Sequence, residues 1–133
     1  IIVGEDTGGM THPGEVGLDW AINRNKPDFV GRRSVDILAK APLARQLVGF
    51  SLDLSAPKPL EGHLVIRAGE IVGNVTSCEV SPSLNQIIGL AYAHPDNANP
   101  GDHISIRTEG GVMVQARVEA LPFYDRDNER QLL

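Results

Sequence analysis

Gly73-Asn74-Val75-Thr76-Ser77 opens a stretch that predicts much of the architecture, and this stretch runs through Ser81-Pro82-Ser83-Leu84 to Ile88-Gly89-Leu90-Ala91-Tyr92. Its two apolar runs lie on either side of a Ser-Pro-Ser turn and are typical of β-strands. Each run carries an interior glycine, which costs a strand roughly 0.5–1 kcal/mol relative to alanine. We therefore expect a bulge or another backbone to come close at Gly73 and Gly89.

Alternation of apolar and polar residues predicts further strands around this pair. It begins at Gln46 and is clearest after the Glu109-Gly110-Gly111 turn, where every second residue from Val112 to Ala120 is apolar. The predicted strands cover residues 46–54, 64–66, 71–80, 86–93, 103–108 and 112–120. Such closely spaced antiparallel strands predict a mainly β fold of six to seven strands, as a sandwich or small barrel.

The first 44 residues have a different pattern. Residues 1–17 are rich in glycine and predict a loop, since their acidic residues lack the ligand spacing of a calcium-binding loop. Residues 18–22 predict a short strand, and residues 34–40 a helix that Pro42 stops. We expect a connector over 1–44 and a β-domain over 45–133. On residue type alone, Trp20 is expected to pack in the core.

Composition narrows the class of protein. The chain has 133 residues and a net charge of −5, which fits one globular domain. Its basic residues form no stripe interleaved with aromatics, and its apolar runs are too short to span a membrane, so neither nucleic acid nor a bilayer is an expected partner. The single cysteine, Cys78, is compatible with a reducing, cytoplasmic setting. The chain begins without methionine, so we expect a processed or excised part of a longer protein.

The residues give no pattern of a self-contained active site. The four histidines, at 12, 63, 94 and 103, stand alone without metal-ligand spacing, so no metal site is expected. Cys78 lies in an apolar run without an evident His or cationic neighbour, which predicts a buried small hydrophobe rather than a reactive thiol. No nucleophile motif or phosphate-binding glycine loop is present.

The pattern G-x-V-T-S, S-P-S-L and I-G-L-A-Y resembles the C-terminal domain of the glycine-cleavage T-protein (aminomethyltransferase) family. That family includes the folate-binding ends of dimethylglycine and sarcosine dehydrogenases and oxidases. Four further segments, together with Thr11, look like the α-subunit of heterotetrameric sarcosine oxidase: 1–7, 17–22, 26–34 and 122–125. Two departures, Thr11-His12-Pro13 and Cys78, count against a true T-protein more than against the superfamily.

The resemblance implies a short helical connector followed by a distorted jelly-roll or β-barrel. It also implies tetrahydrofolate as the acceptor of a one-carbon unit, which in the oxidases comes from an N-methyl amine oxidised by flavin. Flavin and NAD would belong, by analogy, to missing parts or to partner subunits. The expected partners are the N-terminal half of the parent chain and other sarcosine oxidase subunits. The family's acidic catalytic residue precedes this segment, so the chain alone is expected to be inactive.

Three residues match family positions near folate: Trp20, Tyr124 and Arg130. An indole at Trp20 would stack on or wall off the pterin ring, and Arg130 could pair with a glutamyl carboxylate. Two alternatives stay open, namely a packed core tryptophan and a solvated tail arginine. At the level of the whole domain, the alternative is a module for subunit contacts that has no folate role.

Overall fold

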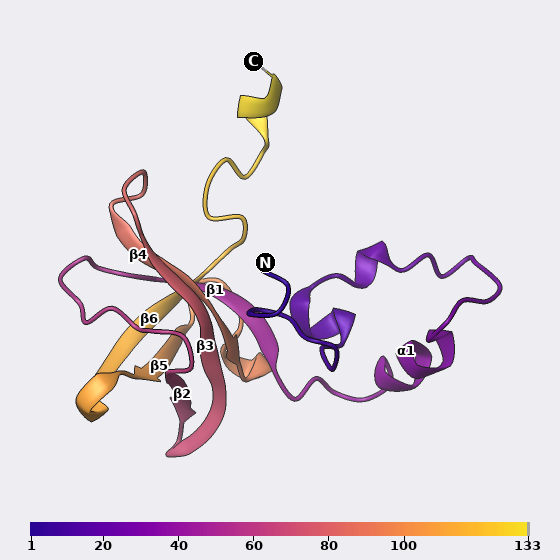
Figure 1. The fold of residues 1–133 in the computed structure, drawn as a ribbon, viewed down its shortest axis with the longest axis horizontal. Coiled ribbons are helices and arrows are strands. Elements are labelled where there is room, and N and C mark those ends of the chain that lie inside the picture. Colours follow the sequence, from indigo (N-terminus) through magenta and orange to yellow (C-terminus); the bar gives the residue numbers. More distant parts are fainter. Residues whose placement is uncertain (133) are drawn as a thin grey trace.

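A computed structural model describes residues 1–132 and shows one closed antiparallel barrel of six strands (Figure 1). The strands pair in the order β1-β4-β3-β2-β5-β6, and β6 closes the barrel on β1. The predicted mainly β class is confirmed. The strands are β1 (Gln46–Leu52), β2 (Leu64–Arg67), β3 (Glu70–Ser81), β4 (Gln86–Ala93), β5 (His103–Arg107) and β6 (Met113–Glu119).

Alternate strand residues fill the barrel, as the period of two predicts. Within β6 the inward residues are Val114, Ala116 and Val118, whereas Val112, which precedes the strand, is half exposed. In β1 both faces are buried. Val48, Phe50 and Leu52 point into the barrel, and on the outer face Leu47 packs with Leu90, Tyr92, Val16 and Phe123. This outer cluster is where the segments before and after the barrel lie against it.

Residues before β1 form an arm, defined here as residues 12–44, that extends away from the barrel (Figure 1). Its helices are η1 (Pro13–Val16), η2 (Asp19–Ala21) and α1 (Arg32–Leu38). The strand predicted at 18–22 is wrong: this run forms the 3-10 turn η2, in which the Ile22 N–H donates to the Asp19 carbonyl at 3.2 Å. An apolar run forms a strand only beside a pairing partner, and these residues pair with none.

The apolar stripe of α1 does not enter a core. None of its residues is buried, and Ile37 and Leu38 are each at least half exposed. Seven residues are too few for a helix that is stable through its own hydrogen bonds, so an uncovered apolar face leaves α1 with little tertiary support. This face is therefore available for a contact that residues 1–132 do not supply.

The close approaches predicted at Gly73 and Gly89 are confirmed. A Cβ on Gly73 would lie 1.9 Å from the backbone oxygen of Tyr92, and one on Gly89 would lie 2.5 Å from both the Ser77 oxygen and the Phe50 ring. The strand pairing of β3 with β4 also shifts between Val75 and Ser77. Both glycines thus allow the two longest strands to cross tightly beside a bulge.

That bulge holds the loop at the start of the chain, residues 1–11, against the barrel. Because Thr76 is the extra residue, it and Ser77 both reach the same carboxylate, although successive strand residues normally point to opposite faces. Thr76 Oγ1 and Ser77 Oγ donate to Asp6 Oδ1 at 2.5 and 3.0 Å, and the Ile2 N–H donates to Oδ2 at 2.7 Å. The Tyr92 hydroxyl donates to the Asp6 backbone oxygen at 2.9 Å. We call these four contacts the Asp6 network.

We expect Gly73→Ala to abolish folding or to cost more than about 3 kcal/mol of unfolding free energy, because the new methyl group would overlap a backbone atom that cannot rotate away. Urea denaturation measures the effect. Gly9→Ala is the matched control, since a Cβ there meets nothing within 4 Å. Equal midpoints for the two variants would contradict the close approach.

The Asp6 network also predicts how the stability of the loop depends on pH. Burial by itself raises the pKa of Asp6, but hydrogen bonds from Thr76, the Ile2 N–H and Ser77 outweigh it and lower the pKa below its ordinary value. The stabilisation is therefore complete above the ordinary aspartate pKa of about 3.9 and is lost as the pH falls through the lower folded value. The amide proton shift of Ile2 should titrate with a midpoint below about 3.9, and Asp6→Asn should remove that titration. A midpoint above the ordinary value would overturn this account.

Candidate functional site

Trp20, the first predicted ligand residue, lies on η2 with its side chain 81% exposed. The interpretation that it packs in the core is therefore wrong. An indole this exposed gains almost nothing from folding, since the stabilisation from apolar burial scales with the area removed from water. Trp20 is thus available to a ligand or to another surface.

Tyr124 and Arg130 lie together in the segment after β6. The Arg130 guanidinium stands over the Tyr124 ring, 4.9 Å from its centroid, and the Arg130 N–H donates to Asp125 Oδ2 at 3.3 Å. This segment leaves the barrel in a different direction from the arm, so the structure does not bring the pair to Trp20 (Figure 1). The alternative of a solvated tail charge at Arg130 remains open, because the residue is exposed.

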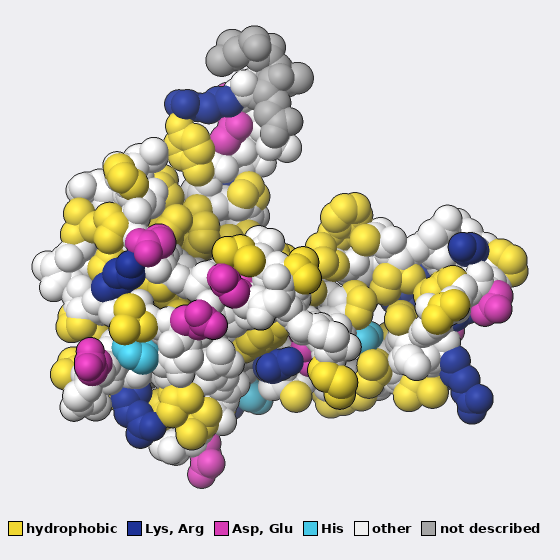
Figure 2. Space-filling view, in the orientation of Figure 1, with side chains coloured by type: hydrophobic (Ala, Val, Ile, Leu, Met, Phe, Trp, Pro, Cys, Tyr) yellow, Lys and Arg dark blue, Asp and Glu magenta, His cyan; other side chains and the backbone are white. Residues whose placement is uncertain are grey.

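Apolar side chains gather over the arm on the face shown in Figure 2. Across the loop and the arm, the most exposed apolar side chains are Val3, Met10, Trp20 and Val30. Single exposed apolar residues are ordinary, but several on one small segment mark an interaction surface. The arm therefore has the composition of a contact face.

A groove of about 330 Å³ lies between the loop 1–11 and the barrel, lined by loop residues together with Arg45, Asn74, Thr76 and Tyr92. Arg45 is held from two sides there. Its guanidinium lies 4.1 Å from the centroid of the Tyr92 ring, and its Nη2 is 3.2 Å from Glu15 Oε2. Arg45 thus joins η1 to the barrel through a cation–π contact and an ion pair.

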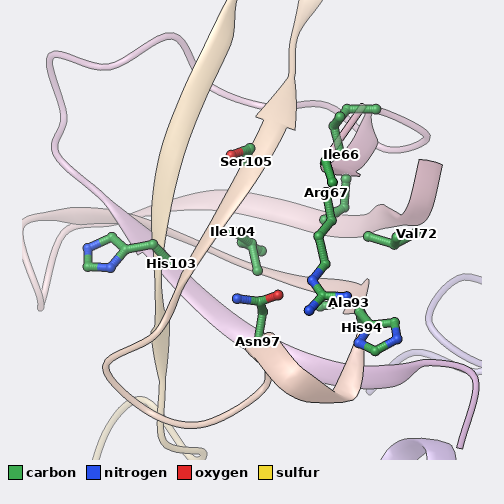
Figure 3. A pocket seen from close by; sticks show the side chains of 11 residues that line it. Ile66, Arg67, Val72, Ala93, His94, Asn97, His103, Ile104 and Ser105 are labelled. Carbon is green, nitrogen blue, oxygen red and sulfur yellow. The ribbon is translucent and has the colours of Figure 1, made fainter. Parts of the chain in front are cut away.

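A second cavity, of about 190 Å³, lies between β2, β5 and the end of β4 (Figure 3). Its apolar lining includes Val72 and Ile104, and Arg67, His94 and Asn97 lie on one side of it. Arg67 is already paired with Asp96 at 2.8 Å, and His94 Nδ1 accepts the Asp96 N–H at 3.3 Å. Asp96 therefore pairs with both Arg67 and His94 beside this cavity.

Three further features bear on function in the described chain: the thiol, any cluster of metal-binding side chains and any membrane-spanning helix. Burial raises the pKa of the Cys78 thiol to about 11, although the nearby Lys58 lowers it in part, so the thiol is protonated at neutral pH. Within residues 1–132 no three His, Cys, Asp or Glu side chains gather as a metal would require. In the same range no helix is long and apolar enough to cross a membrane.

Sequence reasoning missed Asp6, Tyr92 and Arg45. Asp6 appeared as one acidic residue in a glycine-rich loop, and its partners Thr76 and Tyr92 follow 70 and 86 residues later. One signal was available at Tyr92: a tyrosine within an apolar strand normally finds a hydrogen-bond partner for its hydroxyl. Nothing local could identify that partner as the Asp6 carbonyl.

Comparison with known proteins shows which family has a similar sequence and barrel. The family model for the glycine cleavage T-protein C-terminal barrel domain matches residues 45–125. An aminomethyltransferase of Thermotoga maritima is 36% identical over 133 residues, covering 99% of this chain and 35% of the relative. One of Halothermothrix orenii is 35% identical over 122 residues, covering 92% of this chain and 34% of the relative.

Among solved structures, the crystal structure of glycine cleavage system aminomethyltransferase T from Bartonella henselae matches with a TM-score of 0.79 and 26% identity. The match covers 92% of this chain and 35% of that one. The chain thus spans about a third of the length of these relatives. The strands of the closed barrel lie within residues 45–125, the range that the family model matches. The chain therefore belongs to the family of glycine cleavage T-protein C-terminal barrel domains.

Proposed function

We propose that this domain closes one side of a tetrahydrofolate pocket in a larger aminomethyltransferase-like protein. The observation that carries the proposal is the exposed indole of Trp20, which stands on the arm rather than in the core. A flat heteroaromatic ring is what such a surface binds well, because stacking removes two apolar faces from water together. The names of the similar proteins support the same reaction class.

The rest of the pocket comes, in this proposal, from chain that precedes these residues. Two observations support it: the chain spans about 35% of the length of its relatives, and α1 leaves its apolar face uncovered. A preceding segment would cover Ile37, Leu38 and Val30 and would supply the acidic catalytic residue. The isolated domain would then have no activity of its own.

The residues present offer two chemical groups suited to folate, although the structure does not place them side by side. Trp20 offers an aromatic face to the pterin ring, and Arg130 offers a guanidinium suited to a glutamyl carboxylate, with Tyr124 holding it by stacking. When bound, tetrahydrofolate supplies a nitrogen nucleophile that accepts a one-carbon unit. The role of this chain's residues is to bind and orient the cofactor and to keep water from it.

Within the family we propose that the parent is of the sarcosine oxidase α-subunit type, so that the one-carbon unit originates from an oxidised N-methyl amine. Segments 1–7, 17–22, 26–34 and 122–125 support this finer assignment. Flavin and NAD have no proposed site on these residues. The competing function is a subunit-contact module without folate, which the exposed apolar arm would serve equally well.

We expect Trp20→Leu in the full-length protein to weaken tetrahydrofolate binding by about tenfold, since it removes the stacking face while keeping apolar bulk. Calorimetric titration measures the dissociation constant. Leu60→Ala is the control, because it also removes exposed apolar surface but lies outside the arm, between β1 and β2. If wild-type protein does not bind folate, the subunit-contact function replaces this proposal.

We expect Arg130→Gln to weaken binding of tetrahydrofolate more than binding of a pterin that lacks the glutamyl group, because only the former presents carboxylates to the guanidinium. The ratio of the two dissociation constants isolates this contact. Arg126→Gln, a nearby exposed arginine, is the control. If the ratio is unchanged in Arg130→Gln, Arg130 is a solvated residue that does not contact the glutamyl group.

A further inference from the structure

We propose that Asp6, Thr76 and Tyr92 are positioning residues that hold the arm in place, so that they govern folate binding through Trp20 without touching the ligand. This inference rests on the proposed role of Trp20. It adds to that role a mechanism by which an arm whose helices contain no buried residue presents its indole at a fixed place relative to the barrel.

The first step is that the arm and its loop have a single deep anchor. Among residues 1–44, all of which the structure describes, Asp6 is the only one that is fully buried, with 1% of its surface exposed. Neither η1, η2 nor α1 contains a buried residue. Apolar packing of this part of the chain on the barrel includes the partly buried Val16 in the outer cluster, but no fully buried side chain, so the contacts to Asp6 carry a large share of its placement.

The second step is that these contacts are strong and directional. Three donors converge on the carboxylate, and hydrogen bonds to a charged acceptor are stronger than neutral ones. They come from the bulge in β3, where two successive side chains reach one carboxylate. The Tyr92 hydroxyl fixes the backbone at the same residue, so both the side chain and the main chain of Asp6 are held.

The third step connects Asp6 to Trp20. On one path, Tyr92 holds Arg45 against its ring and Arg45 pairs with Glu15 of η1, whose neighbour Val16 packs in the same outer cluster. On the other path, Thr7 and Gly8, directly after Asp6, line a common hollow with Ala21 and Ile22 of the η2 region. The first path ends at Glu15 and Val16, which precede Trp20, and the second ends at Ala21 and Ile22, which directly follow it.

Thr76 allows a sharp test, because its hydroxyl can be removed without changing its shape. In Thr76→Val the donor to Asp6 is lost, whereas Thr76→Ser keeps it. The matched control is Thr108→Val: Thr108 is another buried threonine, whose Oγ1 donates to the Val112 oxygen at 3.0 Å, at the end of a strand that pairs only with β2 and β6.

The first measurement is amide hydrogen exchange in the chain of 133 residues, whose barrel core comes entirely from its own strands. We expect Thr76→Val to accelerate exchange over residues 1–22 by about tenfold or more, and Thr76→Ser to restore the wild-type rate. Thr108→Val should accelerate exchange in β5 and β6 instead. Equal acceleration of residues 1–22 in Thr76→Val and Thr108→Val would overturn the inference, because it would show general destabilisation.

The second measurement is the tetrahydrofolate dissociation constant of the full-length protein. We expect a rise of about tenfold in Thr76→Val, recovery in Thr76→Ser and no change in Thr108→Val at a similar loss of melting temperature. A loosened segment 1–22 with unchanged folate affinity would also overturn the inference. Absence of folate binding in the wild type would instead remove the proposed function, and the exchange rates would still decide whether the network places the arm.

Discussion

The buried carboxylate of Asp6 is the interaction on which the placement of the first third of the chain depends. Burying a charge costs several kcal/mol unless its hydrogen-bonding capacity is met, and here three donors meet it. The same requirement makes the contact selective. A loop that docked in another register would leave the carboxylate without donors, so the barrel accepts this loop in one position.

Tyr92 shows how the barrel and the loop share one residue. Its backbone oxygen lies where a side chain on Gly73 would have to go, its ring packs in the outer cluster and supports Arg45, and its hydroxyl reaches Asp6. The tight crossing of β3 and β4 therefore determines where the loop can bind. A change at Gly73 would act on the arm as well as on the sheet, because both depend on the position of Tyr92.

The domain combines a self-contained part with an uncovered part. The barrel closes on itself and fills its interior with its own side chains, so it has no unpaired sheet edge to protect. The arm, by contrast, leaves apolar side chains and an indole in solvent. This division suits a domain that contributes one wall to a site: the rigid barrel supplies the frame, and the exposed segments supply the contacts.

The sequence by itself determined the strands, because strand position follows from a period of two that is local, and because Gly73 and Gly89 could only be strand glycines where space is short. It left a sandwich and a barrel open, since closure depends on which strands pair. The same local reasoning failed at residues 18–22 and at Trp20. An apolar run is stabilised as a strand or in a core only by neighbours, and none is present there. Only the tertiary structure decided that Asp6 is an anchor. Its partners lie 70 and 86 residues away, and their convergence depends on a bulge and on a strand crossing that no short stretch of sequence encodes.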